Sequence, residues 1–143
     1  MKLSEYMDMM EADAVIDATD LTRESLVIPQ LSAKYNRYLI QESRLLKSAE
    51  VMLSRKELEL FKYYTGDGTD EQYQTKKAIN KRIPKSEAHI YVKSDEDYIT
   101  VATSVHNQNI KVDLIKDFIR QLNQRTFLIK NAIDNEKFKN GIN

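Results

Sequence analysis

Residues 35–64 read YNRYLIQESRLLKSAEVMLSRKELELFKYY, without a glycine or a proline, and their leucines recur every seven residues, at Leu39, Leu46, Leu53 and Leu60. Tyrosines and further apolar residues occupy neighbouring positions, so a wide apolar stripe follows one face of a helix. Glu42 and Lys56 interrupt one edge of this stripe. Because unpaired burial of these charges in a two-stranded zipper would be costly, the pattern favours packing against other helices at a partly wet interface.

The helix is expected to begin well before this segment. The residues Asp17-Ala18-Thr19-Asp20 offer capping oxygens, and between Leu21 and Tyr64 the only strong helix breaker is Pro29. Proline lacks a backbone N–H and clashes with the preceding turn, so we expect Pro29 to kink the helix or to restart it. Gly66 and Gly68 are expected to end it.

Two further patterns follow these glycines. Residues 70–83 are polar and suit one short basic helix, which Pro84 ends. Residues 89–92 (HIYV) and 98–105 (YITVATSV) are rich in β-branched and aromatic residues, and the acidic residues 94–97 (SDED) separate them like a turn. These features predict a small β-hairpin. Helical spacing then returns, and Asn140-Gly141 is expected to end the last helix.

The predicted fold class is therefore mainly α, with a long kinked helix, a C-terminal helix and one small β-hairpin. A chain of 143 residues has the size of one domain. We divide it into an acidic N-terminus with the long helix (1–64), a basic segment with the hairpin (65–105) and a C-terminal helix (106–143).

The C-terminal helix carries more apolar surface than one small monomer easily covers. We therefore expect a cyclic oligomer, held through Ile115, Phe118, Leu122, Ile129 and Ile133. The same spacing equally fits a helix that packs back onto the long helix within one subunit.

Charge is unevenly distributed along a chain whose formal net charge is zero. The first twenty residues hold six acids against Lys2 alone, which suits self-association or a partner with a basic face. Residues 72–86 hold no acid and follow the pair Tyr63-Tyr64. Aromatic rings stack on splayed bases and cations contact phosphates, so this region predicts binding of single-stranded nucleic acid. The predicted DNA-binding residues are Arg55, Lys56, Lys62, Tyr63, Tyr64, Lys76, Lys77, Lys81, Arg82 and Lys85.

A second interpretation of the same region is a solvated basic loop beside core tyrosines. Tyr63 and Tyr64 point about 100° apart on a helix, so one is expected in the core and the other free to stack.

Several classes of function are not expected from this sequence. The absence of cysteine excludes disulfides, a thiol nucleophile and a cysteine-ligated zinc. The Gly66-Asp67-Gly68 turn lacks the lysine of a phosphate loop, and no residue set has the spacing of a metal site or a catalytic constellation. No apolar stretch approaches the roughly 20 residues that span a bilayer. We therefore expect a non-enzymatic protein without cofactor or metal, in the cytoplasm.

Taken together, these residues resemble the UvsY-type recombination mediator family of T-even-like bacteriophages. The resemblance runs nearly end to end, in a shared order with almost ungapped spacing. It rests on Ile16-Asp17, Thr19, Leu21 and Glu24; on Tyr63-Tyr64, Gly66 and Gly68; on Lys85-Ser86-Glu87, Asp95 and Asp97; and on Arg125, Phe127, Ile129, Lys130, Ile133 and Phe138.

The resemblance implies an accessory protein that binds single-stranded DNA and contacts the phage recombinase and the phage single-strand-binding protein. It helps the recombinase to displace the latter in an infected bacterial host cell, during recombination-dependent replication and repair. The resemblance further implies a ring of six or seven subunits, with seven favoured, held chiefly through the C-terminal region.

This chain departs from the family pattern before the paired tyrosines. Leu58 and Leu60 stand where family members carry two basic residues, and Asp67 lies in the glycine turn. The DNA surface is therefore expected to have moved toward Arg55, Lys56, Lys62 and the basic segment. Two other interpretations remain open: a helical scaffold or adaptor whose basic cluster contacts a protein, and an RNA-binding oligomer.

Overall fold

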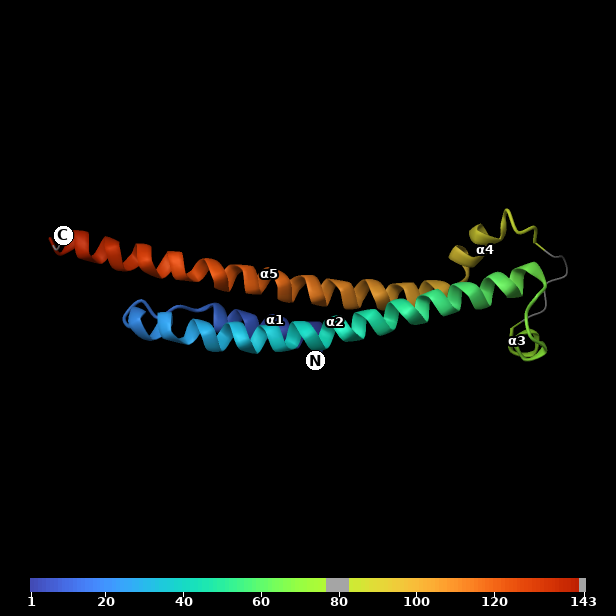
Figure 1. The fold of residues 1–143 in the computed structure, drawn as a ribbon, viewed down its shortest axis with the longest axis horizontal. Coiled ribbons are helices and arrows are strands. Elements are labelled where there is room, and N and C mark those ends of the chain that lie inside the picture. Colours follow the sequence, from blue (N-terminus) through green and yellow to red (C-terminus); the bar gives the residue numbers. More distant parts are fainter. Residues whose placement is uncertain (77–82, 142–143) are drawn as a thin grey trace. The chain divides into compact units, whose positions relative to one another are not determined.

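The computed structural model describes residues 1–76 and 83–141, and this part of the chain is mainly α-helical, as predicted (Figure 1). Its helices are α1 (Leu3–Ala14), α2 (Leu21–Thr65), α3 (Asp70–Thr75), α4 (Ala88–Ser94) and α5 (Glu96–Lys139). Two compact units can be distinguished, one of residues 1–42 with 111–143 and one of residues 43–110. Both long helices contribute to both units, so the units are described in turn.

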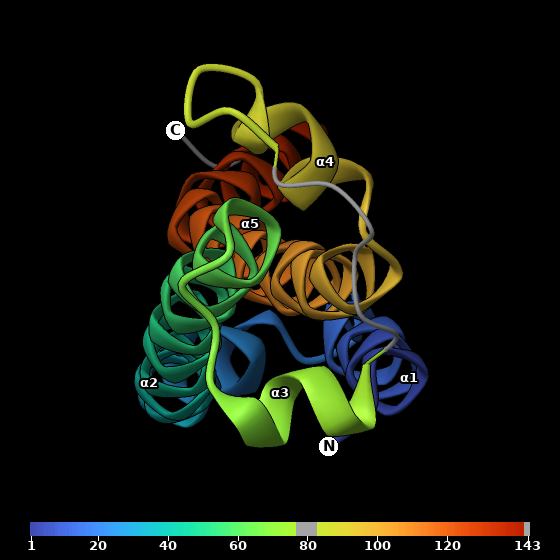
Figure 2. The same cartoon turned by 90° about the vertical axis from the view of Figure 1, so that its right-hand side faces the viewer.

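In the first unit, α1 and the adjoining parts of α2 and α5 surround one core, and Figure 2 shows these helices end on. Tyr35 of α2 is fully buried, and its ring centroid lies 4.5 Å from that of Phe118 on α5. Tyr6 and Met10 cover the cluster from α1. Glu24 contacts Arg125, Tyr35 contacts Phe118 and Glu42 contacts Lys111, so the two helices run antiparallel here.

Glu42 lies buried in this unit, but it is paired. The Tyr6 hydroxyl donates to Glu42 Oε1 at 2.8 Å, and the Lys111 ammonium lies 3.5 Å from Glu42 Oε2. A buried carboxylate with these partners avoids most of the cost of an unpaired charge. Glu42, which interrupts the leucine stripe of α2, thus makes polar contacts with both α1 and α5.

Arg125 fastens the end of α1 to α5. Its side chain is buried and donates to the carbonyl oxygens of Asp13 and Val15, both at 2.8 Å, while Glu24 Oε2 lies 3.5 Å from Nη2. The last carbonyls of a helix have no partner within the helix. A cation that donates hydrogen bonds to them also interacts favourably with the negative end of the helix dipole. This contact fixes the connection between α1 and α2.

Helix α2 runs through Pro29 and ends where the glycines predict. It is one continuous helix of 45 residues, so Pro29 does not restart it. Gly66 has φ of 85°, and the N–H of Asp67 donates to the carbonyl of Lys62 at 2.8 Å. That bond across five residues, with a glycine in the left-handed region, is a Schellman C-cap. Gly141, which follows α5, also lies in the left-handed region, with φ of 72°.

The second unit is built around the end of α2. Leu60 and Tyr63 are buried there together with Ala88 and Val92 of α4. The short helix α3 is capped by Thr69, whose hydroxyl accepts from the N–H of Gln72 at 3.2 Å. A short helix was predicted between residues 70 and 83, but α3 has the sequence DEQYQT and is acidic instead of basic.

The predicted β-hairpin is wrong. Residues 88–94 form α4 and residues 96–139 form α5, and the described residues contain no strand. Ser94 ends α4, and the acidic residues 95–97 lie at the start of α5 instead of forming a hairpin turn, with Asp95 Oδ1 accepting from the N–H of Asp97 at 2.8 Å. An aspartate at the N-cap and acids in the first turn favour a helix. β-Branched residues lower helix propensity only slightly, so they can lie in a helix that tertiary packing stabilises.

Candidate nucleic-acid interface

The last turns of α2 carry two exposed cations on one side of the helix. Arg55 and Lys62 are seven residues apart and line a groove of about 590 Å³ together with Leu58, which is also exposed. The opposite wall comes from the segment around α3, including Asp67 and Glu71. The α2 side of the groove therefore carries two cations and one acid, Glu59, whereas the other side carries acids. Leu60, in contrast, points into the core and is 1% exposed.

Tyr63 lies in the core of the second unit, not on its surface. Its ring is 4% exposed and stands between the rings of Tyr73, 5.3 Å away, and Tyr64, 5.0 Å away. The Tyr73 hydroxyl accepts from the N–H of Gly68 and donates to the carbonyl of Tyr63. A Cβ at Gly68 would lie 2.8 Å from Gln72 Oε1 and 3.0 Å from the Tyr73 ring, so a larger residue here would have to displace these side chains.

Tyr64 is half-buried, and its hydroxyl is fixed by a bond to Asp95 Oδ2 at 2.6 Å. Its ring lies 5.8 Å from that of Tyr91 on α4, which is 45% exposed. The sequence predicted that one of the paired tyrosines would be free to stack. The structure instead presents Tyr91, which the hairpin prediction had placed in a strand.

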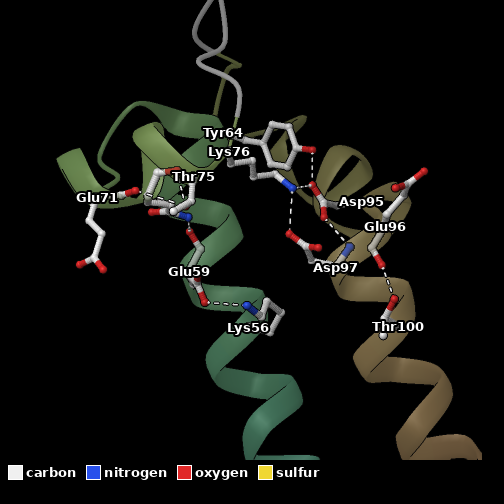
Figure 3. Close-up of polar contacts among 11 residues, drawn as sticks. Lys56, Glu59, Tyr64, Glu71, Thr75, Lys76, Asp95, Glu96, Asp97 and Thr100 are labelled. Atoms are coloured by element: carbon white, nitrogen blue, oxygen red, sulfur yellow. Dashed lines mark hydrogen bonds and ion pairs between the residues drawn. The ribbon is translucent and has the colours of Figure 1, made fainter.

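Lys76, the first cation of the basic segment, is held by two carboxylates (Figure 3). Its ammonium lies 2.8 Å from Asp95 Oδ2 and 3.0 Å from Asp97 Oδ2, and 5.5 Å from the centre of the Tyr63 ring. We call Lys76, Tyr64, Asp95 and Asp97 the Lys76 cluster. It joins the end of α2, the residue after α3 and the start of α5 within the second unit. The N–H of Ile83 also donates to the carbonyl of Tyr64, at 3.0 Å.

The two carboxylates of the Lys76 cluster differ in exposure. The side chain of Asp95 is 3% exposed, whereas that of Asp97 is 59% exposed. Burial alone would raise the pKa of Asp95, but hydrogen bonds from Lys76 and Tyr64 outweigh it and hold that pKa below its ordinary value. Burial and the bond to Asp95 raise the pKa of Tyr64 to about 12.

With Asp95 replaced by asparagine, the free energy of unfolding should therefore depend less on pH below about pH 4. A depressed folded-state pKa gives stability that is present above the ordinary value of 3.8 and is lost as the pH falls through the folded value. At about pH 6 we expect Asp95→Asn to lower the free energy of unfolding by about 2 kcal/mol, the worth of hydrogen bonds to a charged group. This difference should shrink as the pH drops below 3.8. Urea titrations across this range measure it.

Asp97→Asn is the matched control for this experiment, because Asp97 contacts the same ammonium from an exposed position. It should lower the free energy of unfolding by no more than about 1 kcal/mol. Equal losses for both variants, or a loss for Asp95→Asn that stays constant with pH, would contradict the structural role of Asp95.

The other predicted interface residues have diverse environments. Lys56 is half-buried and forms an ion pair with Glu59 at 3.0 Å, while Lys85 is exposed. Lys77, Lys81 and Arg82 lie outside the described residues.

The residues predicted for oligomerisation lie mostly inside the subunit. Ile115, Phe118, Leu122 and Ile129 are buried, and Ile133 is half-buried. The exposed large side chains of the same helix are different ones, chiefly Phe127, Leu128 and Phe138.

Residues 1–76 and 83–141 contain no group of three or more histidine, aspartate or glutamate side chains placed to hold a metal ion. None of their helices is both long enough and apolar enough to cross a membrane.

Comparisons with known proteins agree with the fold. A family model described as "Recombination, repair and ssDNA binding protein UvsY" matches residues 9–142. Crystal structures of the bacteriophage T4 recombination mediator protein UvsY are similar in fold: lattice type IV superimposes with a TM-score of 0.85 at 22% identity, covering 96% of this chain and 99% of that one. Lattice type II gives a TM-score of 0.86 at 23% identity, covering 97% of this chain and 98% of that one. The search of curated proteins gave no significant match.

Proposed function

Because the chain belongs to the UvsY family, we propose that it is a recombination mediator that binds single-stranded DNA. The match of the family model across residues 9–142 is the observation that carries this proposal. The function is non-enzymatic: the protein acts by binding and brings no cofactor or metal to the reaction.

The proposed DNA surface lies in the second unit. Arg55, Lys62 and Lys85 are exposed there, and Lys77, Lys81 and Arg82 lie between the last two along the chain. Each cation that contacts a phosphate releases condensed counterions, which gives affinity without reading sequence. Exposed Tyr91 supports the proposal by supplying an aromatic face on which a base can stack.

The proposed action has two protein partners. On DNA covered by the phage single-strand-binding protein, the mediator promotes displacement of that protein and loading of the phage recombinase. This takes place in the cytoplasm of the infected bacterial host and serves recombination-dependent replication and repair.

We also propose a cyclic homo-oligomer of six or seven subunits, with seven favoured. Support comes from the end of α5, where Phe127, Leu128 and Phe138 are 69%, 60% and 81% exposed. Large apolar side chains exposed in this way favour contact with another subunit. Ile133, which is half-buried, lies between them in the sequence. A ring repeats a weak DNA-binding surface, so that contacts add by multivalency.

Binding to fluorescent single-stranded and duplex oligonucleotides across a salt series tests the proposal. We expect preferential binding to single strands, with affinity that falls linearly on a log-log plot as salt rises. Absence of salt-sensitive binding to single strands would favour the alternative of a scaffold or adaptor that contacts proteins only. Equal binding to single-stranded RNA would favour the RNA-binding alternative.

A further inference from the structure

The Lys76 ammonium contacts two carboxylates, although one is enough to neutralise its charge. Asp95 alone neutralises the ammonium, and its own oxygens are already satisfied by the Tyr64 hydroxyl, by Lys76 and by the N–H of Asp97. Adding Asp97 gives one cation and two anions, so the cluster carries a net negative charge. The side chain of Lys76 is 26% exposed, so it is not sealed from solvent.

The two ion pairs differ greatly in how easily they can be broken. Removing a partner from a buried pair leaves an uncompensated charge, which makes the contact with Asp95 costly to lose. A pair with a largely exposed carboxylate is worth about 0–1 kcal/mol, because water and salt screen it. The side chain of Asp97 is 59% exposed, so its contact with Lys76 can be exchanged at little cost while Asp95 stays in place.

We propose that Asp97 holds the place of a DNA phosphate on Lys76, and that single-stranded DNA binds there by displacing the Asp97 carboxylate. This inference rests on the proposed binding of single-stranded DNA. A phosphate oxygen has the same charge and accepts the same hydrogen bonds from an ammonium as a carboxylate oxygen does. Asp95 remains as the positioning residue that fixes Lys76, and Asp97 acts as an internal competitor that weakens binding to the strand.

Glu96 provides a charge-matched control in the same turn of α5. Figure 3 shows its carboxylate turned away from Lys76, and its backbone carbonyl accepts from the Thr100 hydroxyl at 2.9 Å. Glu96 and Asp97 are adjacent, exposed and equal in charge, but of the two only Asp97 reaches the ammonium. Any general effect of removing one acid near DNA should therefore appear in both variants.

The experiment compares Asp97→Asn with Glu96→Gln in binding to a fluorescent poly-dT oligonucleotide at low and high salt. We expect Asp97→Asn to bind up to about fivefold more tightly than wild type at low salt, the equivalent of one exposed ion pair. Glu96→Gln should change affinity by clearly less. The advantage of Asp97→Asn should fade at high salt, because screening weakens both contacts of the ammonium.

A second background asks whether the effect passes through Lys76. In Lys76→Gln/Asp95→Asn, both charges of the inner ion pair are removed together, so neither is left without a partner. Adding Asp97→Asn to this background should produce no gain in affinity. A gain of the same size there, or equal effects of Asp97→Asn and Glu96→Gln in the wild-type background, would overturn the inference.

Failure of the inference can be told apart from failure of the proposed function. If wild type shows no salt-sensitive binding to the oligonucleotide, both fail. If wild type binds and Asp97→Asn gives no gain over Glu96→Gln, the proposed function stands and only the exchange at Lys76 is excluded.

Discussion

Phe118→Asp is expected to unfold the subunit, even though the sequence suggested Phe118 as an oligomer contact. The side chain is 6% exposed and packs on the fully buried Tyr35, so the substitution removes an aromatic from the core and places a charge there. Truncating a core phenylalanine alone costs about 3–5 kcal/mol, close to the whole stability of many domains. Circular dichroism should show loss of helix at temperatures where wild type is folded.

Phe127→Asp is the matched control, with the same substitution nine positions further along α5. Phe127 is 69% exposed, so the subunit should keep its helical signal and its melting temperature within a few degrees. Under the proposed assembly, its sedimentation coefficient should fall toward that of a monomer. A folded Phe118→Asp protein, or a Phe127→Asp protein that unfolds, would contradict the assignment of these two faces.

Replacing Lys77, Lys81, Arg82 and Lys85 with alanine together should cause the largest loss of DNA binding. The set omits Lys76, so the Lys76 cluster keeps its ion pairs. Each phosphate contact contributes about 0.7 to the magnitude of the log-log salt slope for single strands, so four lost contacts lower it by up to about 2.8. At low salt we expect a loss of affinity on the order of a hundredfold, measured by fluorescence anisotropy.

An equal loss of charge elsewhere separates specific contacts from net charge. Lys116, Lys130, Lys137 and Lys139 are exposed on α5 in the first unit, and their replacement by alanine removes the same four charges. This variant should keep most of the salt slope. Equal slopes for the two quadruple variants would show that the basic segment makes no phosphate contacts of its own.

The long helix α2 could be predicted from the sequence because the spacing of its apolar residues and the glycines after it indicate the same element. The heptad of leucines and the glycine at position 66 determine where α2 packs and where it ends, and both signals are local. The hairpin prediction failed because β-branched residues at 99–105 favour a strand, whereas the acids at 95–97 favour the start of a helix. The role of those acids is local, because Asp95 Oδ1 accepts from the N–H of Asp97 at the first turn of α5.

The candidate site was predicted less completely than the fold. Composition identified the cations, but it could not show that Lys76 is bound to Asp95 and Asp97, since these residues are about twenty positions away in sequence. It also placed the free aromatic at Tyr63 or Tyr64 and missed Tyr91. The oligomer face was ambiguous for the same reason: periodicity shows that a face is buried but not whether its partner belongs to the same subunit.

Recombinase filament assembly on single-stranded DNA that is already covered by the phage single-strand-binding protein tests the central claim most directly. Filament formation can be followed by the ATPase activity of the recombinase, with this protein added in increasing amounts. The expected result is that assembly, slow without the protein, accelerates with it, and that the quadruple variant at Lys77, Lys81, Arg82 and Lys85 loses the effect. Unchanged assembly in the presence of protein that binds single strands would contradict the role of mediator.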